Sequence, residues 1–291
     1  MRQATRIDGF VKRYLRSLDL SGKIVIDIPA GAGIMTRVLR EQGARVEAFD
    51  LFPELFDVEG MTCRKADLSK ELPIASASAD LVICQEAIEH VPNQVQMLRE
   101  LSRVLKVGGR LVLSTPNVSN LRARLSNFLV ESELYKRLPA NELDAVWLSS
   151  GTAEDTYFGH LFLVGIQRLR VLARIAGFRL VRLHPVKWST MSVALGIFYP
   201  LIALASWRAW SNSMRKTDAA TARKREVFDE IRRLNLDPTV LFGKKLFVEF
   251  EKEKDPGSMA EVFRENRDSV MEHIERQKEL EKEDRRRESR G

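Results

Sequence analysis

Short apolar runs alternate with amphipathic segments along the first part of the chain. Helical spacing of apolar residues predicts helices over residues 34–42, ended by Gly43, and 93–106, ended by Gly108 and Gly109. Strands that alternate with helices are typical of βαβ units, and near-continuous apolar strands indicate a sheet covered on both faces. We therefore predict a Rossmann-like, doubly wound α/β fold with its first strands at residues 23–28, 45–50, 61–66, 79–84 and 110–114.

The rest of the chain extends this pattern and then interrupts it. A predicted helix at 164–176 precedes a strand at 178–185, and a further strong apolar strand is predicted at 241–251. The residues between these strands are mostly helical, and the end of the chain is dominated by charge, which predicts an exposed helix that frays. We expect a main domain of residues 1–187 plus 238–252, a helical, partly apolar insertion of 188–237, and a charged tail of 253–291.

A glycine turn connects the first predicted strand to the first helix. Residues 25–35 read VIDIPAGAGIM, with Gly31 and Gly33 in the turn. Small residues let a ligand approach the backbone, and the N-terminus of the helix offers N–H groups. A dinucleotide motif requires a third glycine where this chain has Thr36. The turn therefore indicates a nucleotide-type ligand other than NAD or FAD.

Acidic residues follow the first three predicted strands. Asp27 ends the first strand, Asp50 the second, and Asp67 follows the third. Ligands of open α/β sheets bind at the carboxyl ends of the strands, where Asp50 can accept hydrogen bonds from ribose hydroxyls and Asp67 from an adenine amino group. Each aspartate alone would equally suit a turn. Three in register with a glycine turn favour a ligand site.

In order and spacing, these motifs resemble those of class I S-adenosylmethionine-dependent methyltransferases. The resemblance covers residues 7–187, continuing through 80–86 and 105–113, and resumes at 241–251, although Pro29 replaces the first glycine of the family's first motif. It implies S-adenosyl-L-methionine as cofactor and a seven-stranded, mostly parallel sheet with an antiparallel last strand. It also implies cofactor contacts from Asp27, Ala30, Gly31, Gly33, Asp50, Leu51, Asp67, Leu68 and Gln85.

Three ionisable residues follow the fourth predicted strand. Glu86, Glu89 and His90 would share one face of a helical turn. His90 or Glu86 can act as general base for an acceptor hydroxyl. The sequence EAIEH is also similar to the E-x-x-E-H metal ligands of ubiquinone-pathway O-methyltransferases and small-RNA 2′-O-methyltransferases. That similarity implies Mg²⁺ or another divalent metal bound by Glu86, Glu89 and His90, with His160 as a fourth ligand. In a third interpretation, no metal binds and His90 only forms a hydrogen bond beside the cofactor.

The uncharged stretch 188–207 is long enough to cross a bilayer, and a basic stretch follows it to residue 233. The strands flanking the insertion should pair in one sheet, so both of its ends must stay on one side of a membrane. This favours peripheral membrane contact through 188–233. The alternatives are a buried helical hairpin or a homodimer face, with Ile197, Leu201 and Leu204 packed against the domain.

Composition bears on location and partners. Two cysteines without metal-ligand spacing and no apolar leader indicate a cytoplasmic protein. The insertion adds the expectation of a peripheral position on the inner face of the membrane. A net charge of +7 favours an anionic partner. We expect O-methylation of a hydroxyl on a small-molecule, lipid-linked glycan or quinone-like acceptor. An RNA-end 2′-O-methyltransferase ranks lower, because the chain lacks an aromatic-interleaved basic module for nucleic acid. A third hypothesis is a catalytically silent scaffold, which would bind S-adenosyl-L-methionine without transferring its methyl group.

Overall fold

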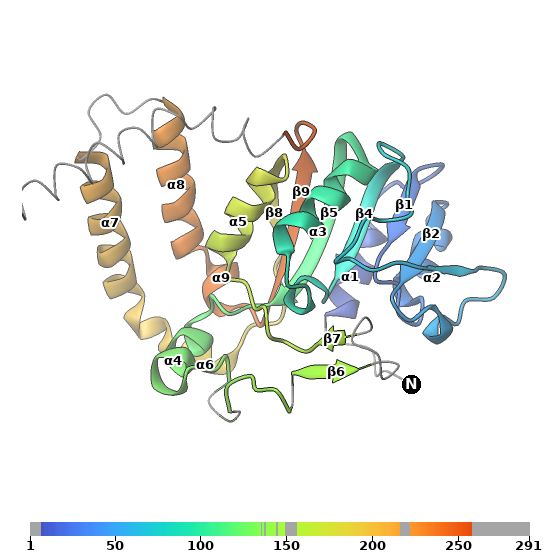
Figure 1. Ribbon diagram of the computed structural model, residues 1–291. Helices are drawn as coiled ribbons and strands as arrows, with labels where there is room; N and C mark the ends of the chain where they lie inside the picture. Colours follow the sequence, from blue (N-terminus) through green and yellow to red (C-terminus); the bar gives the residue numbers. More distant parts are fainter. Residues whose placement is uncertain are drawn as a thin grey trace, which may run out of the picture.

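A seven-stranded sheet in the order β3-β2-β1-β4-β5-β9-β8 forms the centre of the protein. The computed structural model describes residues 7–134, 136, 138–143, 145–148, 156–215 and 222–257. The predicted fold class is confirmed (Figure 1). The strands are β1 (Ile24–Asp27), β2 (Arg45–Asp50), β3 (Cys63–Lys65), β4 (Ala79–Gln85), β5 (Leu105–Pro116), β8 (Phe178–Leu183) and β9 (Lys245–Lys252).

Strands β1 to β5 are parallel, whereas β9 runs antiparallel to both of its neighbours, β5 and β8. The predicted antiparallel closing strand is therefore confirmed, but its predicted start at residue 241 is wrong. Residues Pro238–Phe242 form the short helix α9, because the Asp237 side chain accepts a hydrogen bond from the Thr239 N–H and Pro238 occupies the first turn. The strand begins only at Lys245.

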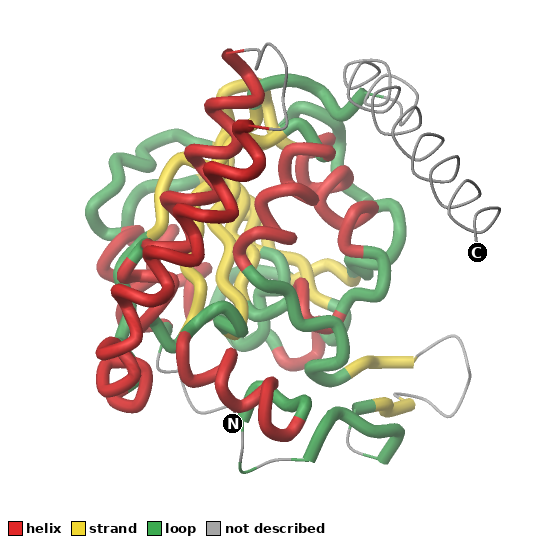
Figure 2. The backbone as a smooth tube through the Cα atoms, turned by 90° about the vertical axis from the view of Figure 1, so that its left-hand side faces the viewer, coloured by secondary structure: helices red, strands yellow, loops and turns green. Residues whose placement is uncertain are grey.

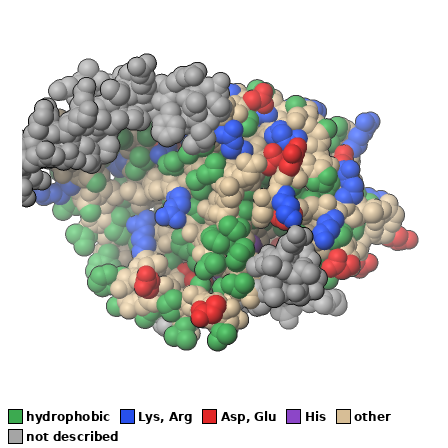
Figure 3. Space-filling view, viewed as in Figure 1, with side chains coloured by type: hydrophobic (Ala, Val, Ile, Leu, Met, Phe, Trp, Pro, Cys, Tyr) green, Lys and Arg blue, Asp and Glu red, His purple; other side chains and the backbone are tan. Residues whose placement is uncertain are grey.

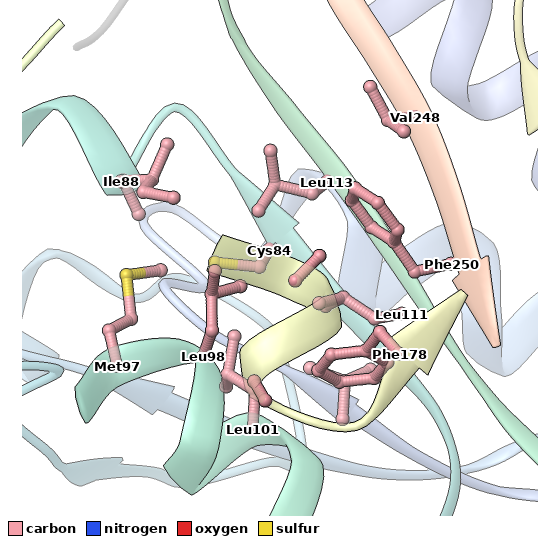
Figure 4. Packing of buried hydrophobic residues seen from close by; sticks show 14 of the residues in the cluster. Cys84, Ile88, Met97, Leu98, Leu101, Leu111, Leu113, Phe178, Val248 and Phe250 are labelled. Atoms are coloured by element: carbon pink, nitrogen blue, oxygen red, sulfur yellow. The ribbon is translucent and has the colours of Figure 1, made fainter. Parts of the chain in front are cut away.

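Helices cover both faces of the sheet. On one face, α1 (Asp8–Leu15) and α2 (Ile34–Glu41) pack on a cluster that includes Leu81 and Ile83 of β4. On the other, α3 (Gln94–Val104) and α5 (Ile166–Ile175) belong to the cluster that includes Val82 and Cys84 (Figure 4). Successive β4 side chains thus enter opposite layers, which explains why the strand is apolar throughout.

Between β8 and β9 lies the helical insertion. It comprises α6 (Thr190–Ala194), the 3₁₀ turn η4 (Leu195–Phe198), α7 (Tyr199–Arg215) and α8 (Ala222–Leu236). Helix α8 lies between α7 and α5 (Figure 1). The alternative of a buried hairpin is wrong: no α7 residue is buried, and Ile197 is 77% exposed. Helix α8 packs with one side on α5 and with the other on α7. The apolar residues of α7 that α8 does not contact are therefore exposed on the outside of the domain.

Several shorter elements border the carboxyl ends of the parallel strands. They are η1 (Pro53–Leu55), η2 (Ile88–His90), α4 (Leu121–Val130) and a two-stranded sheet of β6 (Val146–Leu148) and β7 (Thr156–Phe158). Figure 2 shows this second sheet lying apart from the main one. The predicted helix in the charged tail begins at Ser258, which lies outside the described residues.

Candidate active site

A cavity of about 410 Å³ opens at the carboxyl ends of the parallel strands. This is the edge at which the sequence places the predicted ligand site. The cavity is lined by residues that follow β1, β2, β3 and β4 and by the tip of β7: Ile28, Pro29, Asp50, Leu51, Phe52, Pro53, Glu54, Lys65, Ala66, Asp67, Leu68, Ser69, Lys70, Glu86, Ala87, His90, Val91, Tyr157 and Phe158.

The glycine turn beside this cavity contains two glycines that serve different purposes. Gly31 has φ +52°, and a side chain there would meet no atom within 4 Å. Gly33 has φ +75°, and a side chain there would collide with Val58 and Phe56. Gly31 therefore leaves open space next to the cavity, as close approach of a ligand requires. Gly33 instead meets a packing requirement of the fold.

Asp27 lies buried behind the turn. The Thr36 hydroxyl donates a hydrogen bond of 2.5 Å to its carboxylate. Burial raises the pKa of Asp27 to about 7. The threonine at the third glycine position of a dinucleotide motif therefore ties α2 to β1. Because Asp27 does not line the cavity, its predicted cofactor role can only be indirect.

Replacing Asp27 by asparagine is expected to change how stability depends on pH. A carboxyl with a raised folded-state pKa binds more protons in the folded than in the unfolded state between about pH 4 and pH 7, so stability falls as pH rises through this window. The asparagine side chain would keep an acceptor for Thr36 without titrating. Urea unfolding at pH 5 and pH 8 should show the wild type losing roughly 2–4 kcal/mol relative to Asp27→Asn. An equal pH dependence in both proteins would contradict the assignment.

The carboxylates of Asp50 and Asp67 both line the cavity and both hold a turn. Asp50 accepts backbone hydrogen bonds from Gly31, at 2.7 Å, and from Phe52, at 2.8 Å. Asp67 accepts one from Ser69 at 2.8 Å. Each carboxylate oxygen has two lone pairs, so these bonds orient the groups and leave acceptor capacity toward the cavity. Turn formation and ligand binding are therefore compatible at both positions.

The predicted cofactor residues divide into two groups. Four of them line the cavity: Asp50, Leu51, Asp67 and Leu68. The others lie outside its lining: Gly31 borders it, Gln85 ends β4, and Asp27, Ala30 and Gly33 are buried beneath the turn. Within the second group, Asp27, Ala30 and Gly33 shape the turn, whereas Gly31 leaves open space beside the cavity.

Glu86 stands at the cavity wall in a strained conformation. Its φ of +49° lies in the left-handed region, which is uncommon for a non-glycine residue and is enriched at functional sites. Its carboxylate accepts a hydrogen bond of 3.1 Å from Ser114 and forms an ion pair with Lys245. Lys245 was not predicted from the sequence, and the available signal was a lysine directly before the apolar run of residues 246–248.

Three of the four predicted ligands, Glu89, His90 and His160, come together. Their potential ligand atoms all lie within 4.8 Å of one another, and Glu86 is not part of this cluster. The predicted helical face shared with Glu86 is wrong, because Glu86 has a left-handed backbone and the 3₁₀ turn η2 contains only Ile88–His90.

Glu89 is fully buried; one carboxylate oxygen accepts a 2.9 Å hydrogen bond from Thr115, and the other has no partner in the described structure. Burial and the nearby Glu86 raise the pKa of Glu89. A buried carboxylate oxygen without a donor needs either a proton or a cation.

The two histidines suit a cation. The Nδ1 of His90 donates to the carbonyl oxygen of Phe158 at 2.7 Å; since a carbonyl only accepts, the lone pair of the neutral ring is at Nε2. Burial lowers the pKa of His160, which favours the neutral form that binds metal. Together with the unsatisfied Glu89 oxygen, the donor set therefore fits a divalent ion.

Strand β7 brings an aromatic residue to this cluster. The Tyr157 ring stacks on His90 with centroids 5.1 Å apart and meets Phe52 edge-on at 5.9 Å. The His90 and His160 rings are also 5.1 Å apart. Sequence analysis did not select Tyr157, although it lies only three residues before His160. These rings give the cavity an apolar wall beside its ionisable groups.

Comparison with known proteins adds to this geometry. A family model described as "Methyltransferase domain" matches residues 2–183, which include every predicted site residue but not Lys245. The ubiquinone biosynthesis O-methyltransferase of Xanthomonas oryzae pv. oryzae is 36% identical over 109 residues, which are 34% of this chain and 46% of that protein. The protein of the same name from Xylella fastidiosa is 34% identical over 121 residues, which are 38% of this chain and 48% of that protein.

The chain thus spans about half the length of the curated relatives it matches. Among solved structures, the S-adenosylmethionine dependent methyltransferase from Mesorhizobium loti is similar with a TM-score of 0.45 and 17% identity, covering 83% of this chain and 95% of that one.

Proposed function

Because the chain belongs to the methyltransferase-domain family, we propose that it transfers a methyl group from S-adenosylmethionine to a hydroxyl oxygen. The observation that carries this proposal is the cluster of Glu89, His90 and His160, in which His90 lines the cavity and Glu89 lies buried behind it. Such a cluster suits activation of a weakly acidic acceptor, and a hydroxyl must lose its proton during methylation.

Cofactor binding is assigned to the turn and to the ends of β2 and β3. Gly31 admits the ligand beside the backbone, Asp50 accepts hydrogen bonds from ribose hydroxyls, and Asp67 accepts one from the adenine amino group. S-adenosylmethionine supplies a methyl carbon made electrophilic by its sulfonium sulfur. The acceptor oxygen forms the new bond to this carbon as the carbon–sulfur bond breaks, so the protein's task is to align the two molecules.

Glu89, His90 and His160 would hold a divalent ion. Bound there, the ion would lower the pKa of an acceptor hydroxyl. Thr115 orients Glu89, and the Phe158 carbonyl orients His90, so both ligands are positioned before any ion arrives. Glu86, held by Ser114 and Lys245, lines the cavity next to this cluster and can accept the hydroxyl proton.

A metal-free variant of the same reaction is the second candidate. The hydrogen bond from Nδ1 of His90 to Phe158 leaves the basic lone pair of the ring at Nε2. In this case His90 itself accepts the proton of the acceptor hydroxyl. The two versions differ in one observable: chelation of divalent ions stops the first reaction and leaves the second unchanged.

The acceptor is proposed to be a quinone-like ring or another hydroxyl compound with an apolar portion. Phe52, Tyr157 and Phe158 line the cavity and offer ring surfaces on which a planar acceptor can stack. The curated relatives are named for ubiquinone biosynthesis, which agrees with such an acceptor.

The proposed reaction is tested with a hydroquinone that carries a short isoprenoid tail. The protein is incubated with S-adenosylmethionine and this probe, with Mn²⁺ or with EDTA, and O-methylated product is measured by mass spectrometry. We expect product with Mn²⁺ and at least about 10-fold less with EDTA. Equal product under both conditions would support the metal-free variant. Methylation of the matched ring bearing amino groups, with none of the hydroquinone, would overturn the proposed acceptor atom.

A further inference from the structure

A continuous apolar surface lies on the outside of the insertion. Helices α6 and α7 with the η4 turn between them form one segment, Thr190–Arg215, that is long and apolar enough to cross a membrane by length and composition. Only 6% of its most apolar stretch is buried. The exposed apolar side chains of this segment and the residues beside it are Trp188, Met191, Val193, Ile197, Phe198, Tyr199, Leu201, Leu204 and Trp207, which we call the outer apolar face.

Helix α4 extends this face. It packs beside α6 and η4, and its last turn exposes Phe128, Leu129 and Val130, with Phe128 85% exposed. Figure 3 shows hydrophobic side chains gathered at the lower left, over the region of α4 and α6. Exposed apolar patches of this extent on a single chain are typical of interaction surfaces.

A lipid surface suits the arrangement of charge on this face. No charged residue occurs from Trp188 to Trp207, whereas Lys187 and Arg208 bound the stretch. A tryptophan near each end, about half exposed, is the pattern of side chains at a membrane–water interface. Flanking cations are attracted by anionic headgroups, which supplies charge complementarity.

The segment cannot span a bilayer in this fold. Strands β8 and β9, which flank the insertion, pair with each other in the main sheet, so both ends of the insertion lie on the same side. The returning helix α8 holds Asp229 and Glu230, which bond to Trp210 and Arg170. This arrangement excludes a crossing helix and is compatible with contact along a membrane surface.

This face is firmly connected to the edge that carries the active site. Helix α4 follows β5, whose carboxyl end lies beside that of β4 at the cavity edge (Figure 1). Ser192 of α6 bonds to the start of α4, where its hydroxyl lies 3.2 Å from the Arg122 N–H and 3.4 Å from the Asn120 side chain. The α4 end of the outer apolar face therefore lies at the same edge of the sheet as the cavity, and α7 extends from there alongside the sheet (Figure 1).

We propose that the outer apolar face docks the protein on an anionic lipid bilayer, with helix α4 placing the carboxyl edge of the sheet next to the membrane surface. Tryptophan and aliphatic side chains enter the headgroup region, and Lys187 and Arg208 contact the lipid phosphates. Given the proposed function, on which this step rests, an acceptor with a lipid tail would reach the cavity from the membrane surface.

Vesicle sedimentation of the full chain tests the docking. Vesicles of phosphatidylcholine with about 30% phosphatidylglycerol should bind the wild type at least about 10-fold more tightly than pure phosphatidylcholine. A variant with Ile197→Gln, Leu201→Gln and Leu204→Gln should bind at least about 30-fold more weakly. The matched control replaces three exposed valines elsewhere by glutamine: Val107, Val171 and Val181. It should bind within about 2-fold of the wild type.

Binding of S-adenosylhomocysteine, measured on the same samples, separates the two proposals. Unchanged affinity in the triple variant shows that its loss of vesicle binding is not unfolding. A wild type that binds S-adenosylhomocysteine but no vesicles overturns the docking alone. A folded wild type that binds vesicles but not S-adenosylhomocysteine overturns the proposed function alone. A wild-type dimer in sedimentation velocity that the triple variant loses would assign the face to a second copy and overturn lipid docking.

Discussion

Replacing Gly31 by valine is expected to abolish binding of S-adenosylhomocysteine, with at least about a 100-fold loss of affinity. The backbone at this position is left-handed, and an added side chain would enter open space next to the cavity and not another part of the protein. The branched side chain would therefore occupy the volume that the cofactor needs. Calorimetric titration measures the effect directly.

Gly22 provides the matched control. It also has a left-handed backbone, with φ +69°, and a side chain there would meet no atom within 4 Å. It lies before β1, at the opposite end of that strand from the glycine turn. Gly22→Val should carry a similar conformational cost and bind S-adenosylhomocysteine within about 2-fold of the wild type. Equal losses in both variants would show that strain, and not obstruction of the site, causes the effect.

Replacing Glu89 by glutamine should lower the rate of methyl transfer by roughly 100-fold or more, with little change in S-adenosylhomocysteine affinity. Glutamine has nearly the same shape and can still accept the hydrogen bond from Thr115, but it is a poor ligand for a hard cation. The loss should be partly reversed by higher concentrations of Mn²⁺. Turnover is measured over a range of Mn²⁺ concentrations for both proteins.

The substitution Glu251→Gln serves as the control for Glu89→Gln. This carboxylate pairs with Arg179 at the far strands of the sheet and lies outside the cavity. Glu251→Gln should leave turnover and its dependence on Mn²⁺ unchanged. A Glu89→Gln enzyme of wild-type activity, or one whose activity does not respond to Mn²⁺, would remove the carboxylate from the proposed ion site.

Alternation of apolar runs predicted the parallel strands and the helices between them, whereas the antiparallel last strand followed from the family resemblance and β6 and β7 were not predicted. It works because a buried strand such as β4 must be apolar on both faces, as Leu81 and Val82 are. It failed before β9, where the apolar residues Leu241 and Phe242 of α9 were assigned to the strand across Gly243 and Lys244. The Asp237-Pro238 pair marks a helix start there, but the periodicity alone hides it.

The candidate site was only partly predictable, because some of its members are distant in sequence. Asp50, Asp67 and His90 occur at strand ends, where parallel topology fixes their position. Lys245 reaches Glu86 across 159 residues, and no local pattern records that contact. Tyr157 reaches His90 through β7, a strand of three residues whose placement depends on its pairing with β6.

The insertion shows a different limit. An uncharged run such as 188–207 has the same composition whether its helices are buried or exposed. Its exposure depends on which helix packs against α5. Helix α8 occupies that position through contacts with Gln167 and Arg170, so the far side of α7 stays uncovered. Sequence alone therefore left the burial of this segment open.

Calorimetric titration of the wild-type protein with S-adenosylhomocysteine, with and without Mn²⁺, tests the central claim most directly. The geometry of Gly31, Asp50 and the cavity predicts one binding site per chain in both conditions, with a separate Mn²⁺ site that Glu89→Gln weakens. A folded sample that binds no S-adenosylhomocysteine in either condition would contradict the proposed methyl transfer, although the fold would stand.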